Sequence, residues 1–266
     1  MKNSMLKFLT GMVCSCVCVH IISCSSSERE TPITKAPVVQ EENAVAPMSS
    51  SKSASIKSIN EELEKVKYNY DLQTLETLLS HAEEITPTNE KDKFDLLILK
   101  ASLHSLLADI YLYNKHPKFE EIAYQVLSLL DEANKLRPDS LLYYVLYAKT
   151  CGTLCSIDML HTVKYGTKSM EFIEKLQKLY PDHPNAKITN AQLYLRKPSF
   201  MGGDFKKAKK MFMRLRSEYP DNVEIKIDLA RAHLKLGEKK EAKTLLEEII
   251  AAHPRFLPAK KFLETM

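Results

Sequence analysis

The chain has 266 residues, of which 44% are hydrophobic and 27% are charged, and its formal net charge is +4. This balance is that of a globular protein rather than of a disordered chain or an integral membrane bundle. It contains only 6 glycines, well below the roughly 7% of residues that is usual, and no tryptophan. Few positions can therefore adopt positive φ, so glycine-dependent turns and phosphate-binding loops must be scarce. The composition favours a mostly helical protein and argues against β-sandwiches, β-barrels and dinucleotide-binding folds.

Residues 1–23 have the pattern of a secretory signal. Lys2 and Lys7 precede an apolar run, 8–22, that is shorter than the roughly 20 residues of a transmembrane helix. The run ends in Ile21-Ile22-Ser23-Cys24, which resembles the lipobox of bacterial lipoproteins. That resemblance implies lipidation of Cys24, which then becomes the first residue of the mature chain. Plain secretion with an unmodified cysteine is the alternative.

The resemblance to lipoproteins also implies a location. Several acyl chains would hold the mature chain firmly on a membrane, and Ser25, rather than an aspartate, follows Cys24. By analogy with that family, this favours the outer membrane of a bacterial cell envelope, facing the periplasm. Residues 24–55 are rich in Ser, Glu, Pro, Ala and Val, and they predict a flexible linker between the anchor and a folded domain, 56–266.

The low net charge gives no indication of a nucleic-acid partner. Loss of Lys2 and Lys7 with the signal lowers it further, because the signal contains no acidic residue. We therefore expect an envelope protein or peptide as the partner, and the membrane through the anchor. The sequence leaves the oligomeric state open.

From residue 56 onward, apolar residues recur at helical spacing, and prolines divide the chain into similar segments. Each of Pro138, Pro181 and Pro220 is followed directly by an aspartate and, ten residues on, by an alanine; these alanines are Ala148, Ala191 and Ala230. The interval from Pro220 to Pro254 is 34 residues, which is the period of the tetratricopeptide repeat (TPR). Within that frame two further pairs correspond: Ala208 with Ala242, and Phe212 with Leu246.

These units resemble TPR, most clearly over 138–254. The small residues let two antiparallel helices approach closely, and the large residue one turn on fills the gap beside them. The resemblance implies an all-α fold, a right-handed array of about five antiparallel helical hairpins with a short capping helix from Pro258. Lys187 and Lys226 stand where the family prefers tryptophan, so the array is divergent. Upstream, the spacing predicts helices at Ile56–Lys67, Leu72–Ile85, Lys91–Tyr113 and Lys118–Leu136.

In TPR domains the first helix of each hairpin lines a concave groove. By that resemblance Lys149, Gln192 and Arg231, each directly after a repeat alanine, face the groove and can hold the carboxylate or backbone of a peptide. Tyr144, in a cluster with Tyr143 and Tyr147, is a further candidate at a groove edge, although such tyrosines are mostly core residues. An unused, solvated groove is the alternative.

A second candidate surface is basic. Residues 205–216 contain six basic and no acidic side chains, and they lie on a second helix, which faces outward in a TPR array. Contact with anionic lipid headgroups or an acidic partner would involve Lys206, Lys207, Lys209 and Lys210. An ordinary solvated face is the alternative.

The sequence predicts no catalytic residue, cofactor or metal site. The histidines form no HExxH motif and no close pair, whereas a zinc site needs converging ligands. The segment Gly166-Thr167-Lys168-Ser169 lacks a glycine directly before the lysine of a phosphate loop, and we expect it to open a helix on which Ser169 packs. Cys151 and Cys155 are four apart on one predicted helix, where bridging geometry is poor. We expect buried free thiols, with metal binding or intermolecular pairing as alternatives.

These features predict a non-catalytic, lipid-anchored scaffold for protein–protein interaction in the bacterial cell envelope. An alternative comes from the loop from Pro198 to Ala208, Pro-x-Phe-Met-Gly-Gly-Asp-x3-Ala. It resembles the T component of TRAP transporter systems, which are periplasmic lipoproteins with divergent TPR units. That resemblance implies binding of a small ligand or of a substrate-binding protein, and it requires an enclosed apolar pore or pocket between hairpins.

Overall fold

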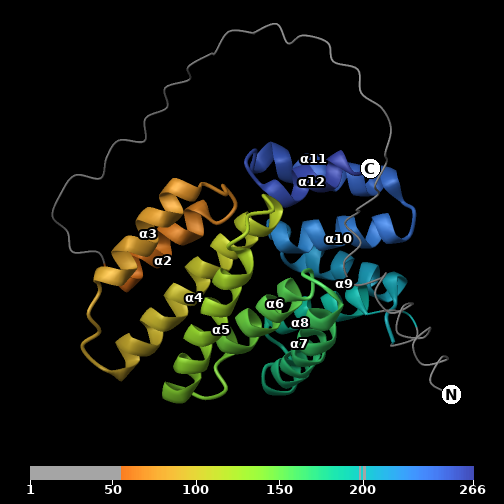
Figure 1. The fold of residues 1–266 in the computed structure, drawn as a ribbon. Coiled ribbons are helices and arrows are strands. Elements are labelled where there is room, and N and C mark those ends of the chain that lie inside the picture. The colour runs from red at the N-terminus through yellow and green to blue at the C-terminus, as the bar shows by residue number, and fades with distance from the viewer. Residues whose placement is uncertain (1–54, 198, 200–201) are drawn as a thin grey trace, which may run out of the picture. The chain divides into compact units, whose positions relative to one another are not determined.

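A computed structural model describes residues 55–197, 199 and 202–266 (Figure 1). Within this part of the chain the regular elements are all α-helices. Their bounds, with the numbering of Figure 1, are α2 (Ile56–Val66), α3 (Leu72–Glu84), α4 (Glu90–Tyr113), α5 (Phe119–Leu136), α6 (Leu141–Leu154), α7 (Met159–Leu179), α8 (Pro184–Arg196), α9 (Phe205–Glu218), α10 (Val223–Lys235), α11 (Lys239–Ala252) and α12 (Leu257–Glu264). The predicted signal peptide, the lipidation site Cys24 and nearly all of the linker lie outside the described residues.

The helices pair along the chain as helical hairpins: α2 with α3, α4 with α5, α6 with α7, α8 with α9 and α10 with α11. The short helix α12 packs against α11 and covers the end of the array. This arrangement confirms the predicted TPR-like array of about five hairpins and a capping helix. The four helices expected upstream of residue 138 are all present, with ends within one residue of their predicted positions.

Most helices begin at a polar side chain that accepts a hydrogen bond from a backbone N–H of the first turn. Such caps satisfy N–H groups that have no partner within the helix, and they fix where each helix starts. They are Ser55, Asp71, Asn89, Ser140, Asp158, His183, Asp204 and Asn222. Between α10 and α11 the turn needs a left-handed residue, and Gly237 supplies it with φ of 78°.

Buried alanines mark the helix crossings of the C-terminal hairpins. Ala191 on α8 and Ala208 on α9 are both 0% exposed, as is Ala242 on α11. Phe212 and Leu246, one turn after the alanine of each second helix, are also 0% exposed. The repeat pattern therefore corresponds to close helix packing with a large side chain filling the space beside each crossing.

The helix α4 is buried on several faces. The consecutive residues 96–99 are all buried, and α4 packs against α2, α3, α5 and α6. Among the described helices, α4 is long and apolar enough to cross a membrane by length and composition alone. Its apolar surface is instead covered by neighbouring helices, as expected for a helix that is hydrophobic around its circumference in the core of a folded domain.

The turn between the helices of the first hairpin touches the turn between α11 and α12. The turn between α2 and α3 contains Tyr68 and Tyr70, whose ring centroids lie 5.7 and 5.4 Å from that of Phe256 at the start of α12. Tyr70 also lies 6.3 Å from the ring of Tyr113 at the end of α4. Asp71 Oδ2 is 3.5 Å from Arg255 Nη1. We call this group of residues the end contact, because it joins the two ends of the array.

Candidate functional site

The first helices of the hairpins lie on the inside of the array. Each packs directly on the next, α4 on α6, α6 on α8 and α8 on α10. The second helices are joined by long side chains instead, for example Arg216 Nη2 to Glu248 Oε2 at 2.9 Å. The array therefore curves around its first helices, and their polar side chains form what we call the inner face. It comprises Asp109, Lys149, Gln192, Asp228 and Arg231.

Lys149 lies on the inner face and is paired with a carboxylate. Its Nζ is 2.8 Å from Asp109 Oδ2 on α4, and its side chain is 43% exposed against 17% for Asp109. Burial acts to lower the pKa of Lys149, but the carboxylates of Asp109 and Glu224 outweigh that effect and raise it. The amine is charged and reachable, and it already has one internal partner.

Asp228 is the centre of a second inner-face group and is only 1% exposed. Gln192 Nε2 donates to its Oδ2 at 2.7 Å from α8, and Arg231 Nη1 donates to its Oδ1 at 2.5 Å. A buried carboxylate is tolerated when such donors surround it. The bond from Gln192 therefore holds α8 and α10 together across a repeat boundary, whereas the bond from Arg231 lies within α10.

Arg231 extends this network to two other helices. Its Nη2 lies 3.5 Å from the hydroxyl of Tyr113 on α4, and its guanidinium lies 4.7 Å from the ring centroid of Phe262 on α12. Burial acts to lower the pKa of Arg231, whereas Asp228 and Tyr113 act to raise it, and the net shift is upward. Arg231 is thus a permanently charged group that links α10 to α4 and α12.

The predicted groove residues divide into two groups. The structure brings Lys149, Gln192 and Arg231 together on the inner face, and their role in binding stays a prediction. Tyr144 is placed differently, because it is 4% exposed and packs on Phe172 in the core between α6 and α7. Its hydroxyl donates to Asp139, so this ring stabilises the start of the hairpin and does not line the inner face.

Asp109, Asp228 and Tyr113 were not predicted as site residues. For Asp228 a signal was present, since it stands between the apolar residues Ile227 and Leu229 on an amphipathic helix and needs a donor there. Asp109 and Tyr113 carry no such signal. Their part in the inner face depends on how α4 packs against α6 and α10.

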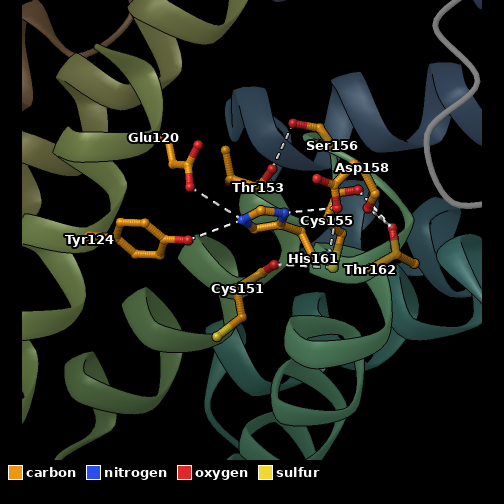
Figure 2. Close-up of polar contacts among 9 residues, drawn as sticks. All are labelled: Glu120, Tyr124, Cys151, Thr153, Cys155, Ser156, Asp158, His161 and Thr162. Carbon is orange, nitrogen blue, oxygen red and sulfur yellow. Dashed lines mark hydrogen bonds and ion pairs between the residues drawn. The ribbon is translucent and has the colours of Figure 1, made fainter. Parts of the chain in front are cut away.

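Figure 2 shows His161 on α7 between two carboxylates. Its Nδ1 lies 2.8 Å from Asp158 Oδ1 and donates a hydrogen bond to it, because a carboxylate only accepts. Its Nε2 lies 3.0 Å from the hydroxyl of Tyr124 and 3.3 Å from Glu120 Oε1, both on α5. Hydrogen bonds from His161 lower the pKa of Asp158, which also caps α7. The imidazole therefore joins the second helices of two successive hairpins.

Two cysteines lie near this histidine. Cys151 and Cys155 are buried thiols that form no disulfide with each other, as predicted. Cys155 Sγ donates to the carbonyl oxygen of Cys151 at 3.2 Å. Burial raises the pKa of Cys151 to about 12, so this thiol stays protonated at neutral pH and is a packing group rather than a nucleophile.

The segment 166–169 lies within α7 and does not open a helix, which corrects that prediction. The helix begins at Met159 because Asp158 provides the cap. Ser169 does pack as expected, since its hydroxyl donates to the carbonyl oxygen of Ala148 on α6 at 2.9 Å. Within the described residues, no group of three or more His, Cys, Asp or Glu side chains is placed to hold a metal ion.

The four lysines predicted to contact an anionic partner lie in the first turns of α9. Lys209 Nζ is 2.6 Å from Glu238, and Lys207 Nζ lies 3.9 Å from the ring centroid of Tyr194. Lys206 and Lys210 are exposed. The fields of these cations add to the positive end of the helix dipole, which makes this end of α9 unfavourable for its own lysines and attractive to anions.

Two cavities on the surface of the described residues both open to solvent among charged side chains. One, of about 640 Å³, is lined by Lys93, Tyr124, Leu127, Ser128, Asp131, Glu132, Lys135 and Leu136. The other, of about 330 Å³, is lined by Arg216, His233, Lys240, Glu241, Thr244, Leu245 and Glu248. Neither is the enclosed apolar pore that the transport alternative requires.

Comparison with known proteins agrees with this architecture. A family model described as tetratricopeptide repeat matches residues 200–262, so this protein contains TPR sequence in its C-terminal part. The crystal structure of a thermophilic TPR protein of Thermus thermophilus is similar to the chain, with a TM-score of 0.52 and 15% sequence identity. The match covers 76% of this chain and 95% of that protein. At this identity the likeness concerns the fold alone. No curated protein matches the sequence significantly.

Proposed function

We propose that this protein is a non-catalytic scaffold that binds an envelope protein or peptide at the inner face of its TPR-like array. The curved stacks of repeat proteins provide extended concave binding surfaces, and the fold supports such a role here. The observation that carries the proposal is the convergence of Lys149, Gln192 and Arg231 from three successive first helices. These side chains present amide and cationic groups suited to a peptide backbone or carboxylate.

The contacts of the inner face indicate how a partner would bind. Arg231 is held by Asp228, which is 1% exposed and cannot turn to solvent. Lys149 is more accessible, and its partner Asp109 is less deeply buried. A partner carboxylate would therefore approach Lys149 and share its amine with Asp109. Because an internal carboxylate competes, we expect modest affinity that weakens with added salt.

The test is capture of a partner by the mature protein from detergent-solubilised membranes, followed by binding of the identified partner in purified form. Lys149→Glu should abolish this binding by placing a second acid beside Asp109. Lys178→Glu is the matched control, because Lys178 is exposed on the second helix α7. Equal loss with both variants, or loss with neither, would contradict a site on the inner face.

The proposal includes anchoring through Cys24 in the outer membrane. It is supported by the lipobox-like sequence before Cys24 and by the composition of residues 24–55. A Cys24→Ser chain should leave the membrane fraction, and the intact mass of the wild-type mature chain should include acyl groups. A wild-type mass without acyl groups would contradict the lipid anchor, whereas the proposed scaffold function would still stand.

An anionic partner at α9 is a separate part of the proposal, and Lys206 and Lys210 are the residues expected to contact it. Lys207 and Lys209 are already engaged by Tyr194 and Glu238. Lys206→Glu with Lys210→Glu should weaken binding to an acidic partner or to anionic vesicles, whereas Lys207→Gln should have a smaller effect. Unchanged binding in the double variant would mark this surface as an ordinary solvated face.

The transport alternative receives no support from the inner face, which is lined by ion pairs, or from the two open cavities. Specific capture of an extracytoplasmic substrate-binding subunit would nevertheless make it the leading hypothesis.

A further inference from the structure

We propose that the outer face of α9 is a docking surface for an anionic lipid membrane, and that docking there leaves the inner face accessible. The inference rests on the proposed envelope location, and it narrows the anionic partner at α9 to lipid headgroups. Binding of the folded array to lipid does not require acylation of Cys24, so it can be measured separately from the anchor.

The N-terminal and C-terminal parts of the folded domain carry opposite net charge. Residues 55–137 contain 15 acidic and 10 basic side chains, whereas residues 138–266 contain 15 acidic and 23 basic ones. An anionic membrane therefore attracts the C-terminal hairpins and repels the first two. This asymmetry gives the domain a preferred orientation at such a surface before any specific contact forms.

Basic side chains are concentrated on α9. This helix contains six basic residues and one acidic residue, Glu218, whose Oε1 lies 3.1 Å from Arg214 Nε. Four of its exposed side chains recur at spacings of four, three and four residues, which places them along one stripe. We call this the outer stripe, and it comprises Lys206, Lys210, Met213 and Ser217. The opposite side of α9 is buried in the core through Ala208, Phe212 and Leu215.

The composition of the outer stripe fits a lipid surface better than a protein. Lysine is depleted in protein–protein interfaces, where aromatic residues and arginine are enriched, and the stripe has two lysines and no aromatic ring. Met213, one turn after Lys210, is 54% exposed. At a membrane, lysine ammonium groups contact phosphates while an apolar neighbour enters the boundary with the acyl chains. The outer stripe presents both kinds of group.

The groove beside α9 does not select a single headgroup. The cavity of about 330 Å³ between α9 and α11 is lined by Glu241 and Glu248 as well as by Arg216 and Lys240. Arg216 already pairs with Glu248 at 2.9 Å. Positive charge is therefore spread along the exposed stripe rather than gathered in this groove, which is the arrangement expected for attraction to many headgroups at once.

Docking through a second helix leaves the inner face free. The inner face is formed by side chains of first helices, such as Gln192 on α8 and Arg231 on α10, whereas the outer stripe lies on the side of α9 turned away from the core. A segment as long as residues 24–55 can span as much as roughly 100 Å, so an anchor at Cys24 would let α9 reach the membrane. Tethering would also raise the effective concentration of headgroups, so a modest attraction suffices.

Co-sedimentation with vesicles tests the docking surface in the mature chain carrying Cys24→Ser, which cannot be acylated at that position. This chain should bind vesicles of phosphatidylcholine with phosphatidylglycerol, and it should bind pure phosphatidylcholine vesicles far less. Lys206→Glu with Lys210→Glu should lower the partition coefficient by about tenfold or more. Met213→Ala should lower it several-fold, because the apolar contact is lost.

Lys57→Glu with Lys91→Glu is the matched control, because it makes the same change in net charge at exposed positions of the first two hairpins. It should lower the partition coefficient by less than about twofold. Equal loss in both double variants would reduce the effect to net charge and overturn the inference, as would absence of binding to the anionic vesicles. Capture of an acidic protein in place of vesicle binding would assign the outer stripe to a protein.

Amine labelling of the vesicle-bound chain, followed by mass spectrometry, tests the orientation. Vesicles should slow the labelling of Lys206 and Lys210 several-fold and leave that of Lys149, which is 43% exposed, unchanged. Equal slowing at Lys149 would contradict an accessible inner face. A wild-type mass without acyl groups would contradict the anchor but leave these measurements unaffected, so failure of the anchor and failure of the docking surface can be told apart.

Discussion

The two C-terminal hairpins (α8–α11) and the second hairpin (α4–α5) are stabilised in different ways. In α8–α11 each crossing has a buried alanine, and the second helices place Phe212 and Leu246 in the space beside it. In the hairpin of α4 and α5, α4 is buried on several faces and contacts helices from before and after it in the chain. The first pattern repeats at a fixed period, and the second does not.

This difference shows what a repeat encodes. A period of 34 residues specifies the contacts between sequence neighbours, so the packing of α8–α11 follows from the sequence pattern. The sequence of α4 follows no such repeat, so it does not indicate which helices α4 contacts. The helix is a general hydrophobic surface around which the first three hairpins pack. Two of its polar residues near its C-terminal end, Asp109 and Tyr113, contact Lys149 and Arg231 of the inner face.

The largest expected effect comes from breaking the repeat packing. Phe212→Ala should lower the free energy of unfolding by about 3–5 kcal/mol, because Phe212 is 0% exposed and the cavity cannot collapse fully. Met213→Ala, at a side chain that is 54% exposed, should change it by less than about 0.5 kcal/mol. Urea unfolding followed by circular dichroism measures both. Similar values for the two variants would contradict the assigned packing of α9.

The next prediction concerns the hydrogen-bond network of the inner face rather than the repeat packing. Arg231→Ala should cost about 3 kcal/mol, because it leaves Asp228 buried with Gln192 as its remaining side-chain donor and removes the bond to Tyr113. Arg214→Ala is the control. Its exposed pair with Glu218 should contribute no more than about 0.5 kcal/mol. An Arg231 variant as stable as this control would show that the inner-face network is not needed for folding.

Two glycines sharpen the comparison between turn and helix. Gly237→Ala should destabilise the protein by about 1 kcal/mol, since φ is 78° and only strain opposes the new methyl group. Gly166→Ala should stabilise it by about 0.5–1 kcal/mol, because Gly166 is inside α7 and a Cβ there would meet Cys155 Sγ at an ordinary 3.8 Å. Thermal unfolding should shift in opposite directions. A shift of the same sign would refute this assignment.

The smallest expected effect is on the pH dependence of stability. Hydrogen bonds from Lys209 and His233 lower the pKa of Glu238, so its contribution is present above the ordinary glutamate pKa of about 4.3 and is lost as pH falls through the lower folded value. Glu238→Gln should therefore make stability fall less steeply below about pH 4.3. The exposed neighbour Glu241 provides the control, Glu241→Gln. If Glu238→Gln left the fall of stability at acidic pH unchanged, the stabilising contribution of ionised Glu238 would be contradicted.

Much of the fold could be predicted from local pattern. Apolar spacing and prolines located the helices, and the alanine positions predicted the close crossings. The placement of the candidate site residues was predicted in part: Lys149, Gln192 and Arg231 do share a face, because the repeat frame fixes their direction, and their role in binding stays a prediction. Tyr144 and the carboxylate partners could not be assigned in this way. Their positions depend on contacts between helices far apart in sequence, as in the 118 residues between Tyr113 and Arg231.

The end contact changes the cooperativity expected of such an array. In an open stack each repeat contacts only its neighbours, so the terminal units can fray independently. Here Asp71 and Arg255 are 184 residues apart and adjacent in space, so loss of either terminal hairpin also exposes the other. Closing a loop of that length delays the last step of folding, since chain entropy must be lost first. Once the end contact has formed, each end of the array stabilises the other. Unfolding from either end then requires that the end contact break first.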